Sequence, residues 1–212
     1  MIFLIGGEKG GTGKSTTAFN LASYLAMNNK DVLLVDADPQ LSSSKAISRR
    51  NKNYPDLFKI QGVQLSGDIY DGLSQLKKKY EYIVVDTGGR DSVELRSALL
   101  IADIFITTIR PSQIDIDTLP DLNNITKKAK AMNRGLKSYA LFTHSPTNPN
   151  MDDEKEAKAI LEELPEFIQT KSTLYYRSAY WRTFGNGLSV LDYIDQKAIE
   201  EINNLGKEIY DI

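Results

Sequence analysis

Residues 9–17 read Lys-Gly-Gly-Thr-Gly-Lys-Ser-Thr-Thr, and they lie between a short apolar run at 2–5 and a helical pattern of apolar residues at 18–26. A glycine-rich loop between a strand and a helix is the context in which a phosphate-binding loop forms. The glycines at 10, 11 and 13 permit positive φ angles and a close approach of the backbone to a ligand. Backbone N–H groups at the start of the helix then favour a bound phosphate. The stretch therefore predicts a nucleotide-binding loop.

Two polar side chains of this loop are predicted to bind the phosphates and their metal ion. Lys14 supplies a positive charge for the outer phosphates, and the hydroxyl of Ser15 is placed to ligate Mg²⁺. A flexible turn, the alternative interpretation of a glycine cluster, does not require Lys-Ser-Thr at these positions. We expect the nucleotide to be held by Lys9, Gly10, Gly11, Thr12, Gly13, Lys14, Ser15 and Thr16.

The composition is that of an ordinary globular protein. The chain has 212 residues, 41% apolar and 25% charged, which is enough for one well-filled α/β core, so we expect a single domain over 1–212. Cysteine is absent, which excludes disulfides and thiolate metal sites, and the net charge of −2 argues neither for nor against nucleic acid. Since no apolar run approaches the ~18 residues of a membrane span and no signal peptide is present, we expect a cytoplasmic protein.

Further apolar runs alternate with helical patterns along the chain. Continuous apolar runs are typical of parallel strands covered on both faces, and they occur at 32–35, 82–86, 104–109 and 139–143. A short edge strand is expected at 57–60. Helices are expected at 41–50, 66–79, 92–102, 113–133 (with a kink or start at Pro120), 152–164 and from 192 to the end. This alternation predicts an α/β fold with a doubly wound, mostly parallel sheet flanked by helices.

Carboxylates follow two of the expected strands. Asp36 and Asp38 end one of them, in Asp36-Ala-Asp-Pro-Gln40, and Asp86 ends another. A carboxylate at the end of a buried strand near a phosphate loop commonly orients the Mg²⁺ ion, although Asp86 is also compatible with a helix cap. Two carboxylates separated by one residue on a strand point the same way, so Asp36 and Asp38 can both face the γ-phosphate. We therefore predict that Ser15 and Asp86 hold the metal ion.

The loop departs from the common pattern G-x-x-x-x-G-K-[ST], because Glu8 stands where glycine is expected and Lys9 lies five residues before Lys14. This resembles the deviant Walker A box of the ParA/MinD family of P-loop NTPases, and residues 36–40 are similar to its D-x-D-P-Q box. The resemblance implies an ATPase that uses ATP and Mg²⁺ and releases ADP and phosphate. It also implies that Lys9 reaches the nucleotide of a partner subunit and that Asp38 orients the attacking water. Asp36 is implied to lie nearer the waters of the metal, so that the metal site comprises Ser15, Asp36 and Asp86. The implied catalytic residues are Lys9, Lys14 and Asp38; the alternative for Lys9 is a solvated loop lysine.

A second block, Tyr176–Arg182 followed by Gly187-Leu-Ser-Val190, resembles the R-x-x-Y and G-x-S-V region of the same family. This resemblance implies non-specific DNA binding, for which the expected residues are Arg177 and Arg182, helped by the basic segment 127–137. The alternative is a solvated basic helix face. The family further implies a homodimer formed on ATP binding and a centromere-binding, ParB-like adaptor that stimulates a slow intrinsic hydrolysis.

These observations predict an ATPase for plasmid or chromosome partition, associated with the nucleoid, of the short type without an N-terminal helix-turn-helix extension. One alternative is a positioning ATPase whose cargo is a protein assembly. Another is a small biosynthetic P-loop synthetase or kinase. We expect no membrane contact, because the last helix has an acidic face, which anionic lipid repels, and an apolar stripe suited to packing on the core: Ile199, Ile202, Leu205, Ile209 and Ile212.

Overall fold

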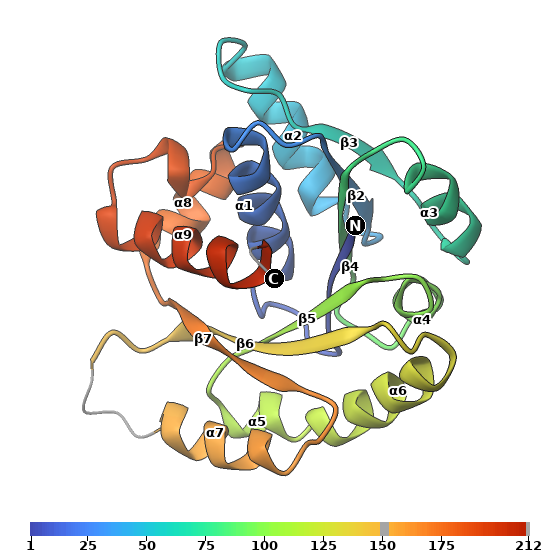
Figure 1. Ribbon diagram of the computed structural model, residues 1–212. Coiled ribbons are helices and arrows are strands. Elements are labelled where there is room, and N and C mark those ends of the chain that lie inside the picture. Colours follow the sequence, from blue (N-terminus) through green and yellow to red (C-terminus); the bar gives the residue numbers. More distant parts are fainter. Residues whose placement is uncertain (149–152, 211–212) are drawn as a thin grey trace.

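The computed structural model describes residues 1–148 and 153–210, and its centre is a sheet of seven strands (Figure 1). In chain order the strands are β1 (Ile2–Gly6), β2 (Val32–Ala37), β3 (Gln61–Gln64), β4 (Tyr82–Thr87), β5 (Ile104–Ile109), β6 (Lys137–Ser145) and β7 (Ile168–Tyr175). Their spatial order is β3-β2-β4-β1-β5-β6-β7, and each neighbouring pair is parallel. The predicted doubly wound α/β fold is therefore confirmed.

Helices cover both faces of this sheet (Figure 1). One face carries α1 (Lys14–Met27), α2 (Ser42–Asn53), α8 (Ser178–Asn186) and α9 (Gln196–Tyr210). The other carries α3 (Tyr70–Leu76), α4 (Val93–Leu99), α5 (Gln113–Ile116), α6 (Leu119–Met132) and α7 (Asp153–Glu162). Because both faces are covered, side chains of β1 alternate between two cores: Phe3 and Ile5 pack with the first layer, and Ile2 and Leu4 with the second.

The register of the central strands brings the predicted site together. Asp86 of β4 lies opposite Ile5 of β1 on one side and opposite Asp36 of β2 on the other. The phosphate loop follows β1 directly, so it shares the carboxyl edge of the sheet with both aspartates. Ligands of doubly wound sheets bind at this edge, near the strand where the order of connections reverses.

Several expected elements differ from the observed ones. The edge strand predicted at 57–60 is instead β3, at Gln61–Gln64, whose side chains are mostly exposed and leave little apolar signal. The helix expected at 66–79 is restricted to α3, Tyr70–Leu76. The long helix expected at 113–133 is divided into α5 and α6, and Pro120 lies in the first turn of α6, where its missing N–H is tolerated. The expected helix start at 152 lies outside the described residues.

Strand β7 is not among the elements expected from the sequence, and helix α8 corresponds only to the helix face given as the alternative for the basic block. β7 is an edge strand whose sequence, Ile-Gln-Thr-Lys-Ser-Thr-Leu-Tyr, is largely polar because it pairs with β6 alone and is only partly covered. α8 is nine residues long and holds the basic and aromatic block noted in the sequence. Neither element has the continuous apolar run or the long helical period on which the sequence interpretation depended.

The apolar stripe of α9 packs on the core as expected. Ile202, Leu205 and Ile209 are wholly buried, in the same cluster as residues of α1. Ile212 lies outside the described residues. Within 1–148 and 153–210, no helix has the combination of length and apolar character that a bilayer crossing requires.

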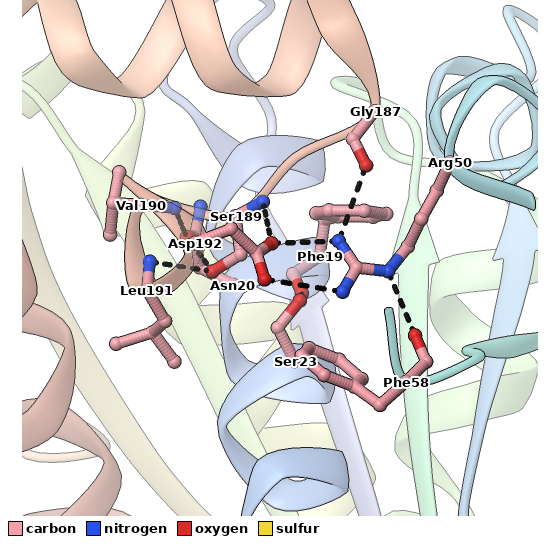
Figure 2. A network of polar contacts seen from close by, with 10 residues as sticks. All are labelled: Phe19, Asn20, Ser23, Arg50, Phe58, Gly187, Ser189, Val190, Leu191 and Asp192. Carbon is pink, nitrogen blue, oxygen red and sulfur yellow. Dashed lines mark hydrogen bonds and ion pairs between the residues drawn. The ribbon is translucent and has the colours of Figure 1, made fainter. Parts of the chain in front are cut away.

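Buried polar contacts join the segment after α8 to α1 and α2 (Figure 2). The guanidinium of Arg50, at the carboxyl-terminal end of α2, forms a 2.7 Å ion pair with Asp192, and the two side chains are 1% and 5% exposed. Its charge also lies 4.1 Å from the ring centroid of Phe58. From α1, Oδ1 of Asn20 accepts a 2.8 Å hydrogen bond from the hydroxyl of Ser189. The first two helices and the G-x-S-V segment therefore form one polar, buried junction.

Candidate functional site

The phosphate loop has the backbone geometry that its glycines predict. Gly11 and Gly13 have φ angles of 75° and 83°. Thr12 fixes the middle of the loop, because its hydroxyl lies 2.9 Å from that of Thr108 and its carbonyl oxygen accepts a 2.8 Å hydrogen bond from Thr143. Helix α1 begins at Lys14 without a side-chain cap and without an acidic residue in its first turn. Its first N–H groups are therefore available to an anion.

Lys14 lies inside this loop, with 6% of its surface exposed. Its ammonium donates a hydrogen bond to the backbone oxygen of Lys9, which leaves two N–H donors for phosphate oxygens. Burial lowers the pKa of Lys14, and the carboxylates of Asp86, Asp38 and Asp115 oppose that shift. The amine therefore lies between the loop and the acidic strand ends.

Asp86 is fully buried below the loop. Oδ2 accepts a 2.7 Å hydrogen bond from the hydroxyl of Ser43, whereas Oδ1 is buried without a hydrogen-bond partner. Burial raises the pKa of Asp86 to about 7, and the nearby hydroxyls of Ser43 and Ser15 act in the opposite direction. A buried carboxylate oxygen that faces a phosphate loop and lacks a partner is what a cation site requires.

The other two aspartates have different surroundings. Asp36 is 1% exposed, and both of its oxygens accept backbone N–H groups, from Asp38 at 3.2 Å and from Ser44 at 2.7 Å. Asp38 lies beyond the end of β2, so the alternation of a strand does not align the two side chains. Its Oδ1 accepts from the N–H of Gln40 at 2.9 Å, and Asp38 lines the cleft above the loop. Asp38 faces the ligand space, whereas Asp36 lies beneath it and anchors α2.

The cleft has a volume of about 670 Å³, within the range of small-ligand sites. Its walls are the phosphate loop, the Asp-Pro-Gln segment after β2 and the loop after β4. The loop after β4 packs closely on the phosphate loop: a Cβ added to Gly89 would lie 2.6 Å from the backbone oxygen of Lys9. Arg90, which sequence reasoning did not select, also lines this cleft and is exposed. Only its place after the Gly-Gly turn marks it in the sequence.

The residues fit a magnesium ion that is held mainly through water and phosphate. Among the side chains that the structure describes, in residues 1–148 and 157–210, no three carboxylate or imidazole groups converge closely enough to bind a metal ion directly. Mg²⁺ retains several waters and binds through one or two carboxylates plus substrate phosphates, so a full protein cage is not required. Ser15 at the helix start and the unpartnered Oδ1 of Asp86 below it provide this partial set.

A recess beside the start of α1 is lined in part by the rings of His144, Tyr180 and Trp181. The ring of His144 packs against the phosphate loop, since a Cβ added to Gly13 would lie 3.1 Å from its Cε1. The His144 and Tyr176 ring centroids are 5.8 Å apart, and those of Tyr176 and Trp181 are 5.0 Å apart. Burial and the nearby Arg110 lower the pKa of His144, which keeps its imidazole neutral at pH 7. Such a surface suits a planar, uncharged ring.

The two predicted DNA-binding arginines are placed differently. Arg177 is 19% exposed at its side chain and donates a 2.6 Å hydrogen bond to Glu201, so its charge is compensated. Arg182 is exposed on α8. The exposed Lys127 and Lys128, expected to help them, lie on α6, which covers the opposite face of the sheet (Figure 1). The sheet therefore separates the two basic clusters.

Fold and site together define a P-loop nucleotide-binding protein of the doubly wound α/β class. The family of CobQ/CobB/MinD/ParA nucleotide-binding domains matches residues 3–190. The chain therefore belongs to this family and is a nucleotide-binding ATPase of the ParA/MinD type.

Similarity to individual proteins agrees with this membership. The chain is 30% identical over 198 residues to the maintenance of carboxysome distribution protein A of Gloeobacter kilaueensis, across 91% of this chain and 84% of that protein. It is 33% identical over 133 residues to the chromosome-partitioning ATPase Soj of Thermus thermophilus, across 61% of this chain and half (50%) of that protein. A solved structure from Borrelia burgdorferi B31, of a protein assigned to plasmid partition and bound to AMPPNP, has a TM-score of 0.76 at 22% identity and covers 99% of this chain and 98% of that one. This last similarity shows the fold.

Proposed function

We propose that the chain is one ATPase domain that partitions a plasmid or similar DNA cargo. Two subunits close on ATP, the dimer binds DNA without sequence preference, and a DNA-bound adaptor stimulates hydrolysis and release on the nucleoid in the cytoplasm. The observation that carries this proposal is the lysine at position 9, whose backbone contacts both the Lys14 ammonium and the Gly89 turn at the mouth of the cleft. Related proteins named for chromosome partition and carboxysome distribution support it.

The chemistry follows from charge and position. Phosphoryl transfer requires the phosphates to be held and their charge neutralised, which the uncapped start of α1, Lys14 and a Mg²⁺ ion at Ser15 and Asp86 would do. Asp38 is a carboxylate on the cleft wall, and we assign it the role of orienting the attacking water. Lys9 is assigned to the nucleotide of the partner subunit. Asp36 would act on the metal's waters only through its remaining lone pairs, because backbone N–H groups already occupy both oxygens.

We assign DNA binding to the surface formed by α2 and α8, which pack against each other. Exposed cations of this surface include Lys45 and Lys52 of α2 and Arg182 of α8. Contacts of such side chains with phosphates do not depend on sequence and weaken with salt. Arg177 contributes less, because it is paired with Glu201.

Charge reversal tests this surface. We expect Arg182→Glu to weaken ATP-dependent DNA binding about 10-fold at low salt. The slope of log affinity against log salt concentration should fall by about 1 per subunit, because binding releases fewer counterions when a phosphate contact is lost. Lys127→Glu is the matched control, because it makes the same charge change on the opposite face of the sheet. A gel shift with random-sequence DNA over a series of salt concentrations measures both. Equal losses in the two variants would contradict the assignment.

A second candidate is a positioning ATPase whose cargo is a protein assembly. The match to the carboxysome distribution protein across 91% of the chain favours it. Such a protein shares the ATP-dependent dimer, so the two candidates differ in the partner, which a pulldown with a hydrolysis-deficient variant and ATP would identify. Absence of any DNA binding with ATP at low salt would instead favour a small-molecule synthetase or kinase.

A further inference from the structure

The first turn of α2 lies directly on the two buried aspartates of the sheet edge. Asp36 and Asp86 are opposite each other on adjacent strands. The hydroxyl of Ser43 donates to Asp86, and the backbone N–H of Ser44 donates to Asp36, both at 2.7 Å. Successive residues of one helix turn thus bind the two carboxylates, one through a side chain and the other through the backbone.

The hydrogen bond from Ser43 makes the two oxygens of Asp86 different, because only one of them has a partner. Ser43 is wholly buried and occupies Oδ2, which leaves Oδ1 as the buried oxygen without a partner. Without this bond the carboxylate could rotate and present either oxygen to the site. Asp36 lacks such a difference, because a backbone N–H group binds each of its oxygens.

Helix α2 is held in place from its other end as well, so Ser43 has little freedom to move away. Arg50 joins the carboxyl-terminal end of the helix to Asp192 and donates a 3.0 Å hydrogen bond to the backbone oxygen of Phe58 (Figure 2). Ala46, one turn after Ser43, is fully buried in the core formed with α1. A helix fixed at both ends presents the Ser43 hydroxyl at a defined point.

We propose that Ser43 is a positioning residue for the magnesium ion: its hydroxyl holds Oδ2 of Asp86, so that Oδ1 is directed at the waters of the metal. This inference rests on the Mg²⁺-dependent ATP hydrolysis proposed above. Ser43 acts through Asp86 and does not touch the ion. Partners that orient a metal-binding carboxylate in this way typically contribute 10–100-fold to metal affinity.

The test measures metal binding without turnover. Mg²⁺ is titrated into the full chain and into Ser43→Ala in the presence of mant-AMPPNP, a non-hydrolysable fluorescent ATP analogue, and the fluorescence is followed. Nucleotide binding without Mg²⁺ and thermal stability are measured in parallel. We expect the half-saturating Mg²⁺ concentration of Ser43→Ala to rise about 10-fold or more. Nucleotide binding without Mg²⁺ should remain unchanged, which a general distortion of the site would not allow.

Two variants separate the hydroxyl from the helix. Ser44→Ala is the matched control, because it removes a neighbouring hydroxyl and keeps the backbone N–H that binds Asp36. Ser43→Thr retains the hydroxyl. We expect the half-saturating Mg²⁺ concentration of both variants to stay within about 2-fold of the wild-type value, well below the increase expected for Ser43→Ala. The inference would be overturned if the half-saturating Mg²⁺ concentration of Ser43→Ala equalled that of the wild type, or if Ser44→Ala or Ser43→Thr raised it as much as Ser43→Ala does. Either result would leave the proposed function standing. A wild-type protein that binds nucleotide equally well without Mg²⁺ would overturn the proposed metal site together with the inference.

Discussion

Asp38→Ala is expected to bind ATP as well as the wild-type protein does and to hydrolyse it at least about 100-fold more slowly. Asp38 lines the cleft beyond the end of β2, and the Lys14 ammonium donates its hydrogen bond to the backbone oxygen of Lys9 and not to Asp38. Its carboxylate is the ionisable acid on the cleft wall nearest the Gly88–Gly89 turn, where an attacking water would be held. Removing it should therefore affect the reaction and leave the binding of phosphates intact.

Two measurements check this prediction: phosphate release at saturating ATP, and the dissociation constant of a fluorescent ATP analogue. Lys14→Ala is the control, and we expect it to lose nucleotide binding, because it removes the buried cation of the phosphate loop. If Asp38→Ala hydrolyses ATP at the wild-type rate, the role assigned to Asp38 is wrong. If it fails to bind ATP, the separation between binding and chemistry is wrong.

The second large effect concerns stability. Arg50→Met should destabilise the fold by about 3–5 kcal/mol, because it leaves the carboxylate of Asp192 buried without its charged partner. It also removes the hydrogen bond to Phe58 and the contact with its ring. For a chain of this length such a loss corresponds to a decrease in Tm of roughly 6–20 °C.

Urea unfolding followed by circular dichroism measures this loss. Arg96→Met is the matched control, because Arg96 pairs with Asp91 at 2.5 Å while the side chains are 58% and 38% exposed. Exposed pairs contribute at most about 1 kcal/mol, so burial is the difference under test. Comparable losses in the two variants would show that the junction at Arg50 does not depend on a desolvated ion pair.

The parts of this fold and site that could be predicted are those determined by residues close together in the sequence. The phosphate loop requires its glycines and Lys14 in consecutive order, and the strand before it has an uninterrupted apolar run. Asp86 follows another such run, so its place at the same edge of the sheet follows from parallel pairing alone. These features determine the fold class and most of the nucleotide site.

What could not be predicted depends on contacts between distant segments. β7 is an edge strand with polar residues, and no local pattern distinguishes it from a loop. The ion pair of Arg177 joins α8 to Glu201 of α9, and the hydrogen bond of Ser43 joins α2 to β4. Gly89 is required because its loop packs on the backbone of Lys9, a contact that spans most of the first 90 residues. In each case the partner is far away in sequence.

The central claim is that two subunits enclose their nucleotides, each contributing Lys9 to the other. Light scattering during size-exclusion chromatography with AMPPNP and Mg²⁺ tests it most directly, with ADP and nucleotide-free samples as controls. We predict that the mass doubles from the 23.7 kDa of one chain only with AMPPNP, and that Lys9→Ala stays at the single-chain mass. A wild-type protein that remains at 23.7 kDa when saturated with AMPPNP and Mg²⁺ would contradict the account.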